Sequence, residues 1–461
     1  MVEETRVAVL GGGVTGLCAA HYLAKAFGRG NVLLLEASDY IGGQTRSDNI
    51  DGFSCDWGPN GFLDREPLTL KWIEDLGIAH ELLRCNESAA HRFIFKDGRL
   101  HEVVGPPRFL FAPLLSPMGR LRLCCEPLIK AKRDDAPESV WDFAARRIGR
   151  EAADLMVTPM VSGVFGGDAK QLSLEHCFPR MADMERRYGG LVKALIAIKK
   201  VDKSASPLGP RGTLTTFHRG IGFLPDAAVR PLSDRIRTQT PVTGLFRTDG
   251  AYRIQTSAGL TVSAAAVVVA LPAHAAAAVA AGLDADCSVA LRAIAYADIA
   301  VLCTGYRREN VGHDLNGFGF LVPRNQGLRV LGCLWSSSIF PGRAPEGWVQ
   351  LRTMYGGYTD PDAIRLSDNE LIAHLRHEVH PLLQIGGEPE FVRVYRHRPG
   401  IPQYLLGHGE RLRAIAAAEQ RFPGLAFAGN AYRGVGLNDC VVSALRAVDA
   451  LQKKPNVECS R

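Results

Sequence analysis

The stretch from Arg6 to Ala37, RVAVLGGGVTGLCAAHYLAKAFGRGNVLLLEA, constrains the fold of this chain more than any other part of it. An apolar run, Val7 to Leu10, is followed by closely spaced glycines, an alanine-rich helical stretch and a second apolar run, Val32 to Leu35. This order predicts a strand, a tight turn, a helix and a second strand. It is the order found in units that bind a dinucleotide.

Three glycines and one acidic residue in this stretch have the spacing that a bound dinucleotide requires. Gly11 permits the tight turn, Gly13 lets the backbone approach a pyrophosphate, and Gly16 lets the helix pack closely on the strand. Unpaired N–H groups at the helix N-terminus would face the phosphates. Glu36, about twenty residues beyond the last glycine, is placed to accept hydrogen bonds from an adenosine ribose.

The residues that follow Glu36 favour FAD over NAD. A glycine doublet, Gly42 and Gly43, would let the main chain lie flat against a second phosphate or the ribityl arm, and Arg46 could pair with the pyrophosphate. Near the other end, LAFAGNAYRGVGLNDCVVSALRAVDAL predicts a strand, a glycine-rich turn and a helix that points at the same cofactor. We therefore expect one non-covalent FAD, with Cys440 a small buried residue and not an attachment point.

Composition limits the class of protein and its partners. With 461 residues, 46% of them hydrophobic, the chain can bury a large core in two or three domains. Its net charge of +6 suits anionic partners such as carboxylate-bearing substrates or acidic lipid. The chain has no dense basic run, so nucleic acid is not an expected partner. Eleven cysteines without a CxxC pair, and no secretory leader before Val7, predict reduced thiols and a cytoplasmic location.

Two apolar segments could involve a membrane. Ala264 to Leu283 carries no formal charge, but Pro272 and His274 interrupt it, so it predicts a strand over Ala266 to Leu271 and then a short helix. Val103 to Lys132 mixes prolines, large apolar side chains and basic residues without a clean period. The second segment is either a core loop or a surface that rests on lipid headgroups without crossing the bilayer.

A helix is predicted to begin at Ser139. Asp142 lies three residues further on as part of a capping box, and the helix is expected to continue through VWDFAARRIGREAADLMV. Further along, alternating stretches at Ala251 to Ala270 and Arg329 to Tyr355 predict hairpins of a mixed or antiparallel sheet.

These motifs together resemble the flavin amine oxidoreductase superfamily and, within it, the branch that oxidises porphyrinogens. The resemblance covers nearly the whole chain. The motifs that carry it are GGGVTGL, EASDYIGGQTRS, DWGPNGFL at Asp56 to Leu63, HRFIFKDGRL at His91 to Leu100, PMVSGVFGGDAKQLSLEHCFPRM at Pro159 to Met181, GFGFLVP at Gly317 to Pro323, and FAGNAYRGVGLNDC. The glycine fingerprint is shared by the whole superfamily, whereas SGVFGGD followed by LS, FGxLVP and GNxYxGVGxND together are far narrower.

The resemblance implies an α/β fold with three parts: an FAD-binding Rossmann-like domain, a mixed-sheet substrate domain and a helical membrane-associated domain. We expect the FAD-binding domain to comprise residues 1–85, 206–275 and 420–461. The mainly helical, substrate-channel part is expected at 86–205, and the substrate-binding domain at 276–419.

The resemblance also implies site residues. Arg92 matches an arginine that pairs with a substrate propionate, Phe318, Leu321 and Met354 match apolar residues that border the tetrapyrrole, and Gly167 matches the pocket wall. Implied FAD contacts are Gly11, Gly13, Gly16, Glu36, Ala37, Gly43, Gly58, Asn60, Gly61, Val242, Asn430, Val435, Gly436 and Leu437.

The implied reaction is oxidation of protoporphyrinogen IX to protoporphyrin IX in haem biosynthesis. A hydride can pass directly from a bridging carbon to flavin N5, so we expect no catalytic Ser, Cys or His and no metal. By the resemblance, oxygen reoxidises the flavin and hydrogen peroxide forms. A peripheral contact with the inner face of the membrane is expected, and an oligomer is compatible with the sequence.

Three alternatives stay open. A coproporphyrinogen III oxidase of the same family would act on a substrate with four carboxylates instead of two. An amine or polyamine oxidase would need an aromatic cage beside the flavin, and the C-terminal turn offers only Tyr432. A non-catalytic escort protein on the same fold would not need a complete set of FAD contacts.

Overall fold

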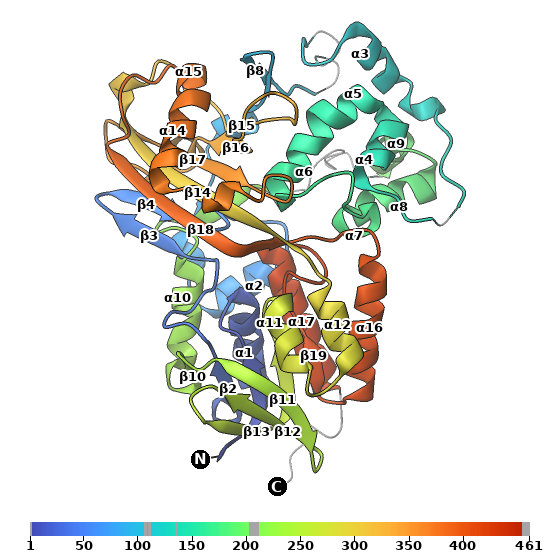
Figure 1. The fold of residues 1–461 in the computed structure, drawn as a ribbon, viewed down its shortest axis with the longest axis vertical. Coiled ribbons are helices and arrows are strands. Elements are labelled where there is room, and N and C mark those ends of the chain that lie inside the picture. The colour runs from blue at the N-terminus through green and yellow to red at the C-terminus, as the bar shows by residue number, and fades with distance from the viewer. Residues whose placement is uncertain (1, 106–107, 109–111, 135, 202–211, 454–461) are drawn as a thin grey trace.

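Two seven-stranded sheets organise the described residues, and the first described strand and the last described helix both lie in the half of the molecule that the first sheet forms (Figure 1). The computed structural model describes residues 2–105, 108, 112–134, 136–201 and 212–453. The second sheet lies at the opposite end, beside a group of helices (Figure 1). This arrangement agrees with the predicted mixed α/β class.

The first sheet is parallel at its centre and is covered on both faces. Along β1, Val7 and Val9 enter one apolar cluster with α1, α2, α10 and α17, whereas Ala8 and Leu10 enter another with α11, α12 and α16. In spatial order, its strands are β10 (Ile236–Arg237), β2 (Val32–Leu35), β1 (Val2–Leu10), β13 (Thr261–Val269), β12 (Ala251–Thr256) and β11 (Val242–Thr248), with β19 (Leu425–Phe427) also on β13. The helices are α1 (Val14–Phe27), α2 (Pro67–Asp75), α10 (Phe223–Val229), α17 (Leu437–Gln452), α11 (Ala273–Ala280), α12 (Ala285–Arg292) and α16 (His408–Arg421).

The second sheet is mixed, with only β7 and β15 running parallel. Its strands in spatial order are β18 (Phe391–Pro402), β14 (Tyr296–Arg307), β17 (Trp348–Gly356), β16 (Gly332–Leu334), β15 (Gly319–Leu321), β7 (Arg92–Lys96) and β8 (Arg99–Glu102). The helices α14 (Asp368–Glu378) and α15 (His380–Leu383) cover one face. The strands β3 (Ser47–Ile50) and β4 (Phe53–Asp56) pair with each other as a hairpin, and this hairpin covers part of the other face.

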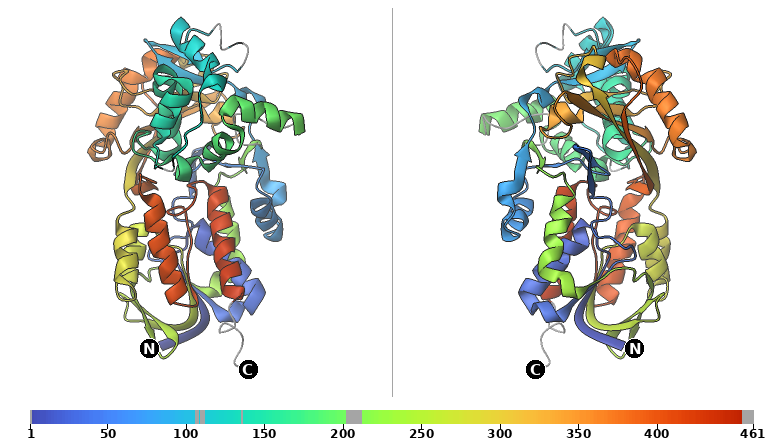
Figure 2. Two further views of the ribbon diagram at one scale, coloured as in Figure 1. Left: turned by 90° about the vertical axis from the view of Figure 1, so that its right-hand side faces the viewer. Right: turned by 90° about the vertical axis from the view of Figure 1, so that its left-hand side faces the viewer.

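A small sheet joins the two halves, and short helices complete the fold. The small sheet contains β5 (Phe62–Leu63), β9 (Leu214–Phe217) and β6 (Leu82–Arg84). The remaining helices are α3 (Pro117–Cys124), α4 (Val140–Ile148), α5 (Arg150–Ala152), α6 (Thr158–Phe165), α7 (Leu174–Cys177), α8 (Pro179–Tyr188), α9 (Leu191–Val201) and α13 (Ser336–Ile339). The views of Figure 2 place α9 at the side of the molecule, projecting away from the body.

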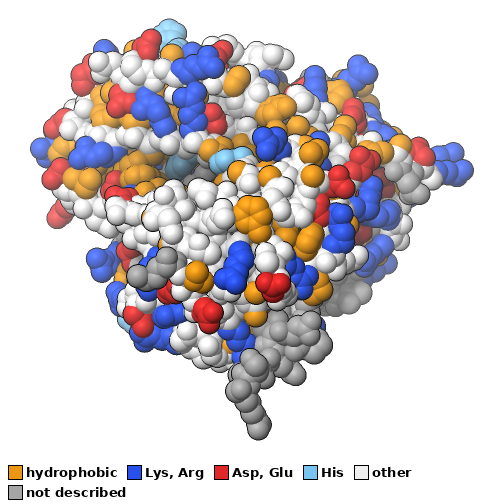
Figure 3. Space-filling model, turned by 60° about the horizontal axis from the view of Figure 1, so that its bottom comes forward, with side chains coloured by type: hydrophobic (Ala, Val, Ile, Leu, Met, Phe, Trp, Pro, Cys, Tyr) orange, Lys and Arg blue, Asp and Glu red, His pale blue; other side chains and the backbone are white. Residues whose placement is uncertain are grey.

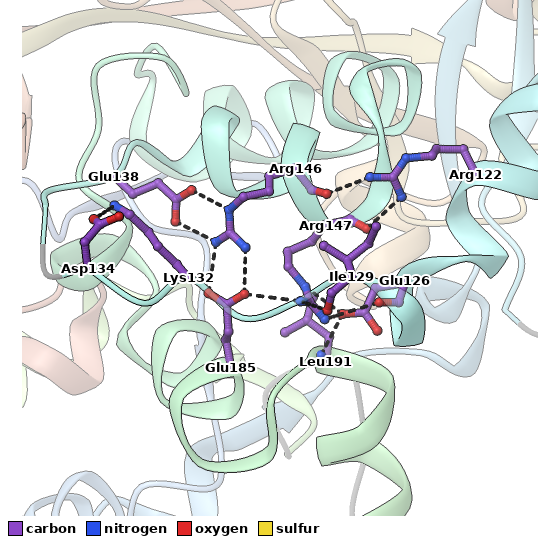
Figure 4. A network of polar contacts seen from close by, with 10 residues as sticks. All are labelled: Arg122, Glu126, Ile129, Lys132, Asp134, Glu138, Arg146, Arg147, Glu185 and Leu191. Atoms are coloured by element: carbon purple, nitrogen blue, oxygen red, sulfur yellow. Dashed lines mark hydrogen bonds and ion pairs between the residues drawn. The ribbon is translucent and has the colours of Figure 1, made fainter.

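A buried cluster of charged side chains holds the helical part together (Figure 4). The guanidinium of Arg147 in α4 is fully buried and donates to the carboxylates of Glu126 and of Glu185 in α8. The Glu126 carboxylate also accepts the Leu191 and Val192 N–H groups, at 2.8 and 3.1 Å, at the start of α9. Thus one carboxylate fixes α4 and α9 to the segment that follows α3.

Two of the predicted domain ranges disagree with the way these elements pack. β7 and β8 lie within the range 86–205, predicted as mainly helical, but they extend the second sheet because β7 pairs with β15. Most of α11, all of α12 and most of α16 lie within 276–419, yet their apolar faces bury against the first sheet. These helices therefore belong by packing to the part of the molecule that is built on the first sheet.

The local predictions can be compared with the elements directly. Ser139 caps α4 and accepts the Asp142 N–H at 3.0 Å, which confirms the predicted start. The predicted single helix is wrong beyond Ile148, because Gly149 has a φ of 94° and ends α4. The strand and short helix expected near residue 270 are confirmed as β13 and α11. Among the helices of the described residues, none is long and apolar enough to cross a bilayer.

Charged side chains of both signs are scattered over the face that Figure 3 shows. Apolar side chains lie between them in small groups. This mixture agrees with the modest net charge of +6.

We expect Glu126→Ala to destabilise the protein by about 3–5 kcal/mol, because it leaves the buried Arg147 guanidinium undercompensated. The control is Asp183→Ala, which removes only exposed ion pairs with Arg186 and Arg187 and should cost less than about 1 kcal/mol. Urea unfolding followed by circular dichroism measures both. Equal losses in the two variants would contradict the role given to the buried cluster.

Candidate functional site: a dinucleotide cradle facing the second sheet

The turn between β1 and α1 is built on close contacts that only glycine allows. A Cβ on Gly16 would lie 1.9 Å from the Gly11 carbonyl oxygen, so the first turn of α1 rests on the end of β1. Gly11 has a φ of 102°, and a Cβ there would lie 2.6 Å from the Ala270 carbonyl oxygen at the end of β13. These contacts place the N-terminus of α1 above the carboxyl ends of the central strands, where nucleotides bind in such sheets.

Gly13 differs from its two neighbours in this motif. A Cβ built on it has no atom within 4 Å, so the space beside it is open. Gly13 is also the N-cap of α1, and no side chain caps the helix there. The first N–H groups of a helix have no intrahelical acceptor, so this end is suited to a pyrophosphate.

Glu36 lies at the end of β2 and its carboxylate is held by the backbone. The Gly12 N–H donates to Oε2 at 2.6 Å, and the Ser38 N–H donates to Oε1 at 2.8 Å. Each carboxylate oxygen has a second lone pair available. This geometry fits an acid that receives ribose hydroxyls while the backbone fixes its orientation.

The glycine doublet lies directly against the phosphate turn. The Gly42 N–H donates to the Gly12 carbonyl oxygen at 2.8 Å, and a Cβ on Gly43 would lie 3.5 Å from the Gly13 Cα. The Arg46 guanidinium carbon lies 4.6 Å from the Tyr40 ring centre and 4.2 Å from that of Trp57. Arg46 also lines a cavity of about 390 Å³ beside the glycine doublet. The pairing of Arg46 with the pyrophosphate stays a prediction.

The C-terminal glycine-rich turn brings a second helix N-terminus to the same region. α17 packs beside α1 in the same apolar cluster. Its N-cap is Gly436, whose N–H donates to Asp439 at 3.0 Å, and burial raises the pKa of the Asp439 carboxyl. The Asn430 carbonyl in this turn accepts the Tyr404 hydroxyl.

His408 supports this turn from behind. Its ring is fully buried, lies 4.4 Å from the Tyr404 ring and makes a hydrogen bond with the Tyr432 carbonyl at 3.0 Å. Burial lowers the pKa of His408 to about 4, so the ring is neutral at pH 7. Tyr432 is itself buried in the core beside Phe427, and it therefore offers no exposed aromatic wall for an amine.

The other predicted cofactor residues lie around this turn and the segment after β4. Gly58 and Gly61 have no room for a side chain, because a Cβ would lie 2.5 Å from the Gln44 carbonyl oxygen and 2.6 Å from that of Thr215, respectively. Ala37 follows β2, Asn60 lies between the two tight glycines, Val242 begins β11, and Val435 and Leu437 flank the N-cap of α17. Their contacts with FAD stay predictions.

The predicted substrate residues meet on one face of the second sheet. Leu321 pairs with Gly332, and Gly332 pairs with Met354, across β15, β16 and β17. Directly opposed residues point to the same face, so Leu321 and Met354 lie on one face with a glycine between them. A Cβ on Gly332 would lie 2.9 Å from the Leu321 side chain, and the row therefore forms a low apolar floor.

Arg92 lies at the rim of this face. It begins β7, is exposed, and its guanidinium carbon is 5.3 Å from the ring centre of Phe318. β7 and β15 run parallel with Arg92 opposite Gly319, which keeps Phe318 beside the guanidinium. The predicted charged and aromatic residues are thus brought together.

Gly167 has a reason of its own to be glycine. A Cβ there would lie 2.5 Å from the Gln403 side-chain oxygen and 2.7 Å from Leu172. The neighbouring Gly166 carbonyl accepts the Tyr358 N–H at 2.7 Å, just beyond the end of β17. The loop after α6 is therefore packed against protein atoms, and a contact of Gly167 with substrate stays a prediction.

Sequence reasoning missed Arg352, Gly332, Tyr404 and His408. Gln350 and Arg352 alternate with Val349 and Leu351 in WVQLRTMYG, a pattern that indicates a solvent-facing side of a strand. In the fold, the residues after β4 cover that side, and Arg352 is only 6% exposed. Among the described residues, no group of three or more His, Cys, Asp or Glu is arranged to hold a metal ion.

Comparison with known proteins identifies the family. A sequence profile described as flavin containing amine oxidoreductase matches residues 14–452. The chain belongs to this family, so it is an FAD-dependent oxidoreductase, as the sequence predicted.

Relatives and solved structures extend over the whole chain. A coproporphyrinogen III oxidase of Bacillus subtilis is 29% identical and covers 97% of this chain and 98% of its own length. A chloroplastic protoporphyrinogen oxidase of Oryza sativa is 31% identical and covers 96% and 87%, respectively. A crystal structure from Exiguobacterium shares the fold with a TM-score of 0.84 at 24% identity, covering 97% of this chain and 98% of its own. Putrescine oxidase shares it with a TM-score of 0.65 at 16% identity, covering 98% of this chain and 100% of its own.

We expect Gly13→Asp to abolish FAD binding without unfolding the protein. The new side chain enters open space but places a carboxylate where the pyrophosphate lies, and each lost charge-assisted hydrogen bond weakens binding more than about tenfold. Gly16→Ala should instead destabilise the protein itself, by about 1–3 kcal/mol, because its Cβ meets β1. Flavin absorbance of the purified variants and their thermal unfolding separate the two effects. A yellow Gly13→Asp variant would place the pyrophosphate elsewhere.

Proposed function

We propose that the chain oxidises protoporphyrinogen IX to protoporphyrin IX, with FAD as the hydride acceptor. The observation that carries the proposal is the face of the second sheet, where Leu321 and Met354 form an apolar floor and Arg92 with Phe318 forms the rim. A tetrapyrrole has this character, with an apolar macrocycle and carboxylates at its edge. The names of the full-length relatives support the same substrate class.

In the proposed mechanism the side chains bind and orient the substrate and the cofactor. They transfer no proton and form no covalent intermediate. FAD, when bound, supplies a two-electron acceptor for hydrogen from sp³ bridging carbons. The N-termini of α1 and α17 and the Glu36 carboxylate hold the dinucleotide. The apolar floor excludes water and aligns a bridging carbon, and Arg92 holds a propionate so that the macrocycle can be presented in successive rounds.

Coproporphyrinogen III is the second candidate substrate, since a relative with that activity aligns over 98% of its own length. We propose oxygen as the final acceptor, with one hydrogen peroxide formed for each hydride. Supplying the two porphyrinogens in turn, and recording porphyrin fluorescence and oxygen consumption, tests the substrate and the acceptor together. An amine oxidase or an escort protein would show no porphyrin formation, and an escort protein would also be colourless.

We expect Arg92→Ala to raise KM for the porphyrinogen by about ten- to a hundredfold, the cost of one charged hydrogen bond. The value of kcat should fall much less, because the lost interaction is made equally in the ground state and the transition state. Arg92→Lys should recover part of the loss, since an ammonium cannot form the two-pronged pair. The control is Arg99→Ala on β8, whose KM should not change. An unchanged KM in Arg92→Ala would make the residue a bystander.

We further propose a peripheral, cytoplasmic-side membrane contact through the segment around α3. Phe109, Leu110 and Phe111, three apolar residues of the predicted Val103 to Lys132 segment, lie outside the described residues. In the described part of the segment, the residues Met118, Leu121 and Leu128 are 72%, 59% and 80% exposed, respectively. Apolar side chains of this size at the surface, next to basic residues, are suited to a lipid interface.

We expect the wild type to float with anionic liposomes and the triple variant Met118→Ser, Leu121→Ser, Leu128→Ser to remain in the pellet fraction. Removing three exposed apolar side chains removes the insertion energy, whereas salt should weaken the remaining attraction. Val289→Ser is a matched control, because Val289 is 69% exposed on α12, which packs on the first sheet, away from α3 (Figure 1). Flotation that persists in the triple variant would contradict the proposal.

A further inference from the structure

Arg352 is a buried cation without a carboxylate partner in the described residues. Three arginines are buried there: Arg147, Arg343 and Arg352, with exposures of 0%, 2% and 6%, respectively. Arg147 pairs with Glu126, and Arg343 pairs with Asp56 at 3.1 Å. Arg352 makes hydrogen bonds to the Trp57 and Gly58 carbonyl oxygens only, and its buried Nε–H has no acceptor.

The position of Arg352 lies between the two halves of the candidate site. Its strand, β17, also carries Met354 two residues further on, and residues two apart on a strand share a face. Its guanidinium binds the segment after β4, where Gly58 is a predicted FAD contact. His397 of β18 donates to the same Trp57 carbonyl at 2.8 Å. The free donor of Arg352 thus lies where the cofactor side meets the substrate side.

A buried charge is costly unless an opposite charge or several strong acceptors compensate it. Two backbone carbonyls provide only partial compensation, and the other two buried arginines obtain full carboxylate partners. An anion bound in the site would supply the missing negative charge. Both candidates, reduced flavin and a substrate carboxylate, are anionic.

We propose that Arg352 supplies the positive charge that balances the negative charge gained by FAD when it accepts a hydride. The donor carbon loses the hydride, which carries two electrons and one proton, and a pyrrole N–H then releases the second hydrogen to solvent as a proton. The flavin, which takes up the hydride alone, holds one more negative charge than the oxidised form. A fixed cation beside it favours that state because it needs no reorganisation during the reaction.

The flavin is the better partner than a carboxylate of the substrate. Arg352 binds the Trp57 and Gly58 carbonyl groups, in the segment that carries three predicted FAD contacts, Gly58, Asn60 and Gly61. Arg92 lies three strands away in the same cross-strand row, at roughly 14 Å from the spacing of neighbouring strands. The exposed arginine is therefore suited to a carboxylate that remains partly in water, and the buried arginine to an anion that does not.

The test measures the midpoint potential of the bound FAD in the absence of substrate. We expect Arg352→Gln, which keeps a donor for the carbonyls but loses the charge, to weaken binding of reduced relative to oxidised flavin about tenfold. For a two-electron couple this lowers the midpoint potential by about 30 mV. Arg352→Lys should remain close to the wild type. The control is Gln350→Leu. It removes an uncharged hydrogen bond from a side chain on the same face of β17 to the Ser54 carbonyl, and it should leave the midpoint potential unchanged.

A second measurement needs no variant. If the reduced flavin is anionic, the wild-type potential should change by about 30 mV per pH unit near neutrality, one proton for two electrons. A slope of about 60 mV per pH unit would overturn the inference, because the reduced flavin would then be neutral. An unchanged potential in Arg352→Gln, or a raised KM for the porphyrinogen without a change in potential, would overturn it as well.

The inference depends on the bound flavin and not on the proposed substrate. A wild type that binds FAD but oxidises neither porphyrinogen would contradict the proposed function. The midpoint potentials would still test the role of Arg352. Normal porphyrinogen oxidation together with an unchanged potential in Arg352→Gln would end only the role of Arg352.

Discussion

The contact between Gly16 and Gly11 is the constraint on which the rest of the site depends. Because no Cβ separates them, α1 begins directly on the end of β1 and its N-terminus lies above the carboxyl ends of the strands. The Gly12 N–H can then hold Glu36, and the Gly12 carbonyl can hold the glycine doublet through Gly42. A larger residue in this contact would displace α1 and with it every group arranged around the phosphates.

Buried polar contacts attach the second sheet to the half of the molecule that carries this glycine turn. The buried Arg343, in the turn before β17, pairs with Asp56 and also donates to Ser54 and Thr216, which binds this turn to β4 and β9. Arg352 and His397 continue the same contact to the Trp57 and Gly58 carbonyls. The contact between the two halves is therefore polar and hydrogen-bonded, whereas the row that carries Leu321 and Met354 is apolar.

The fold alone does not define the reaction. Putrescine oxidase shares this fold with a TM-score of 0.65 at 16% identity. Substrate class must therefore be read from the side chains on the sheet face and on the turns. In this chain the aromatic residue of the C-terminal turn, Tyr432, is buried in the core, and an arginine with a phenylalanine lies at the rim instead. These residues favour an anionic, largely apolar ligand over an amine.

The sequence by itself determined the dinucleotide unit, the family and the start of α4, because glycine spacing, strand periodicity and helix caps are local signals. It also placed β13 and α11 correctly within the segment that resembles a membrane span. Only the tertiary structure decided that β7 and β8 extend the second sheet and that α16 covers the first, since strand pairing and helix packing join residues far apart in the chain. The burial of Arg352 was also decided only by the tertiary structure. The alternating sequence around Arg352 is typical of an exposed strand face, and the residues after β4 cover that face only once the chain has folded.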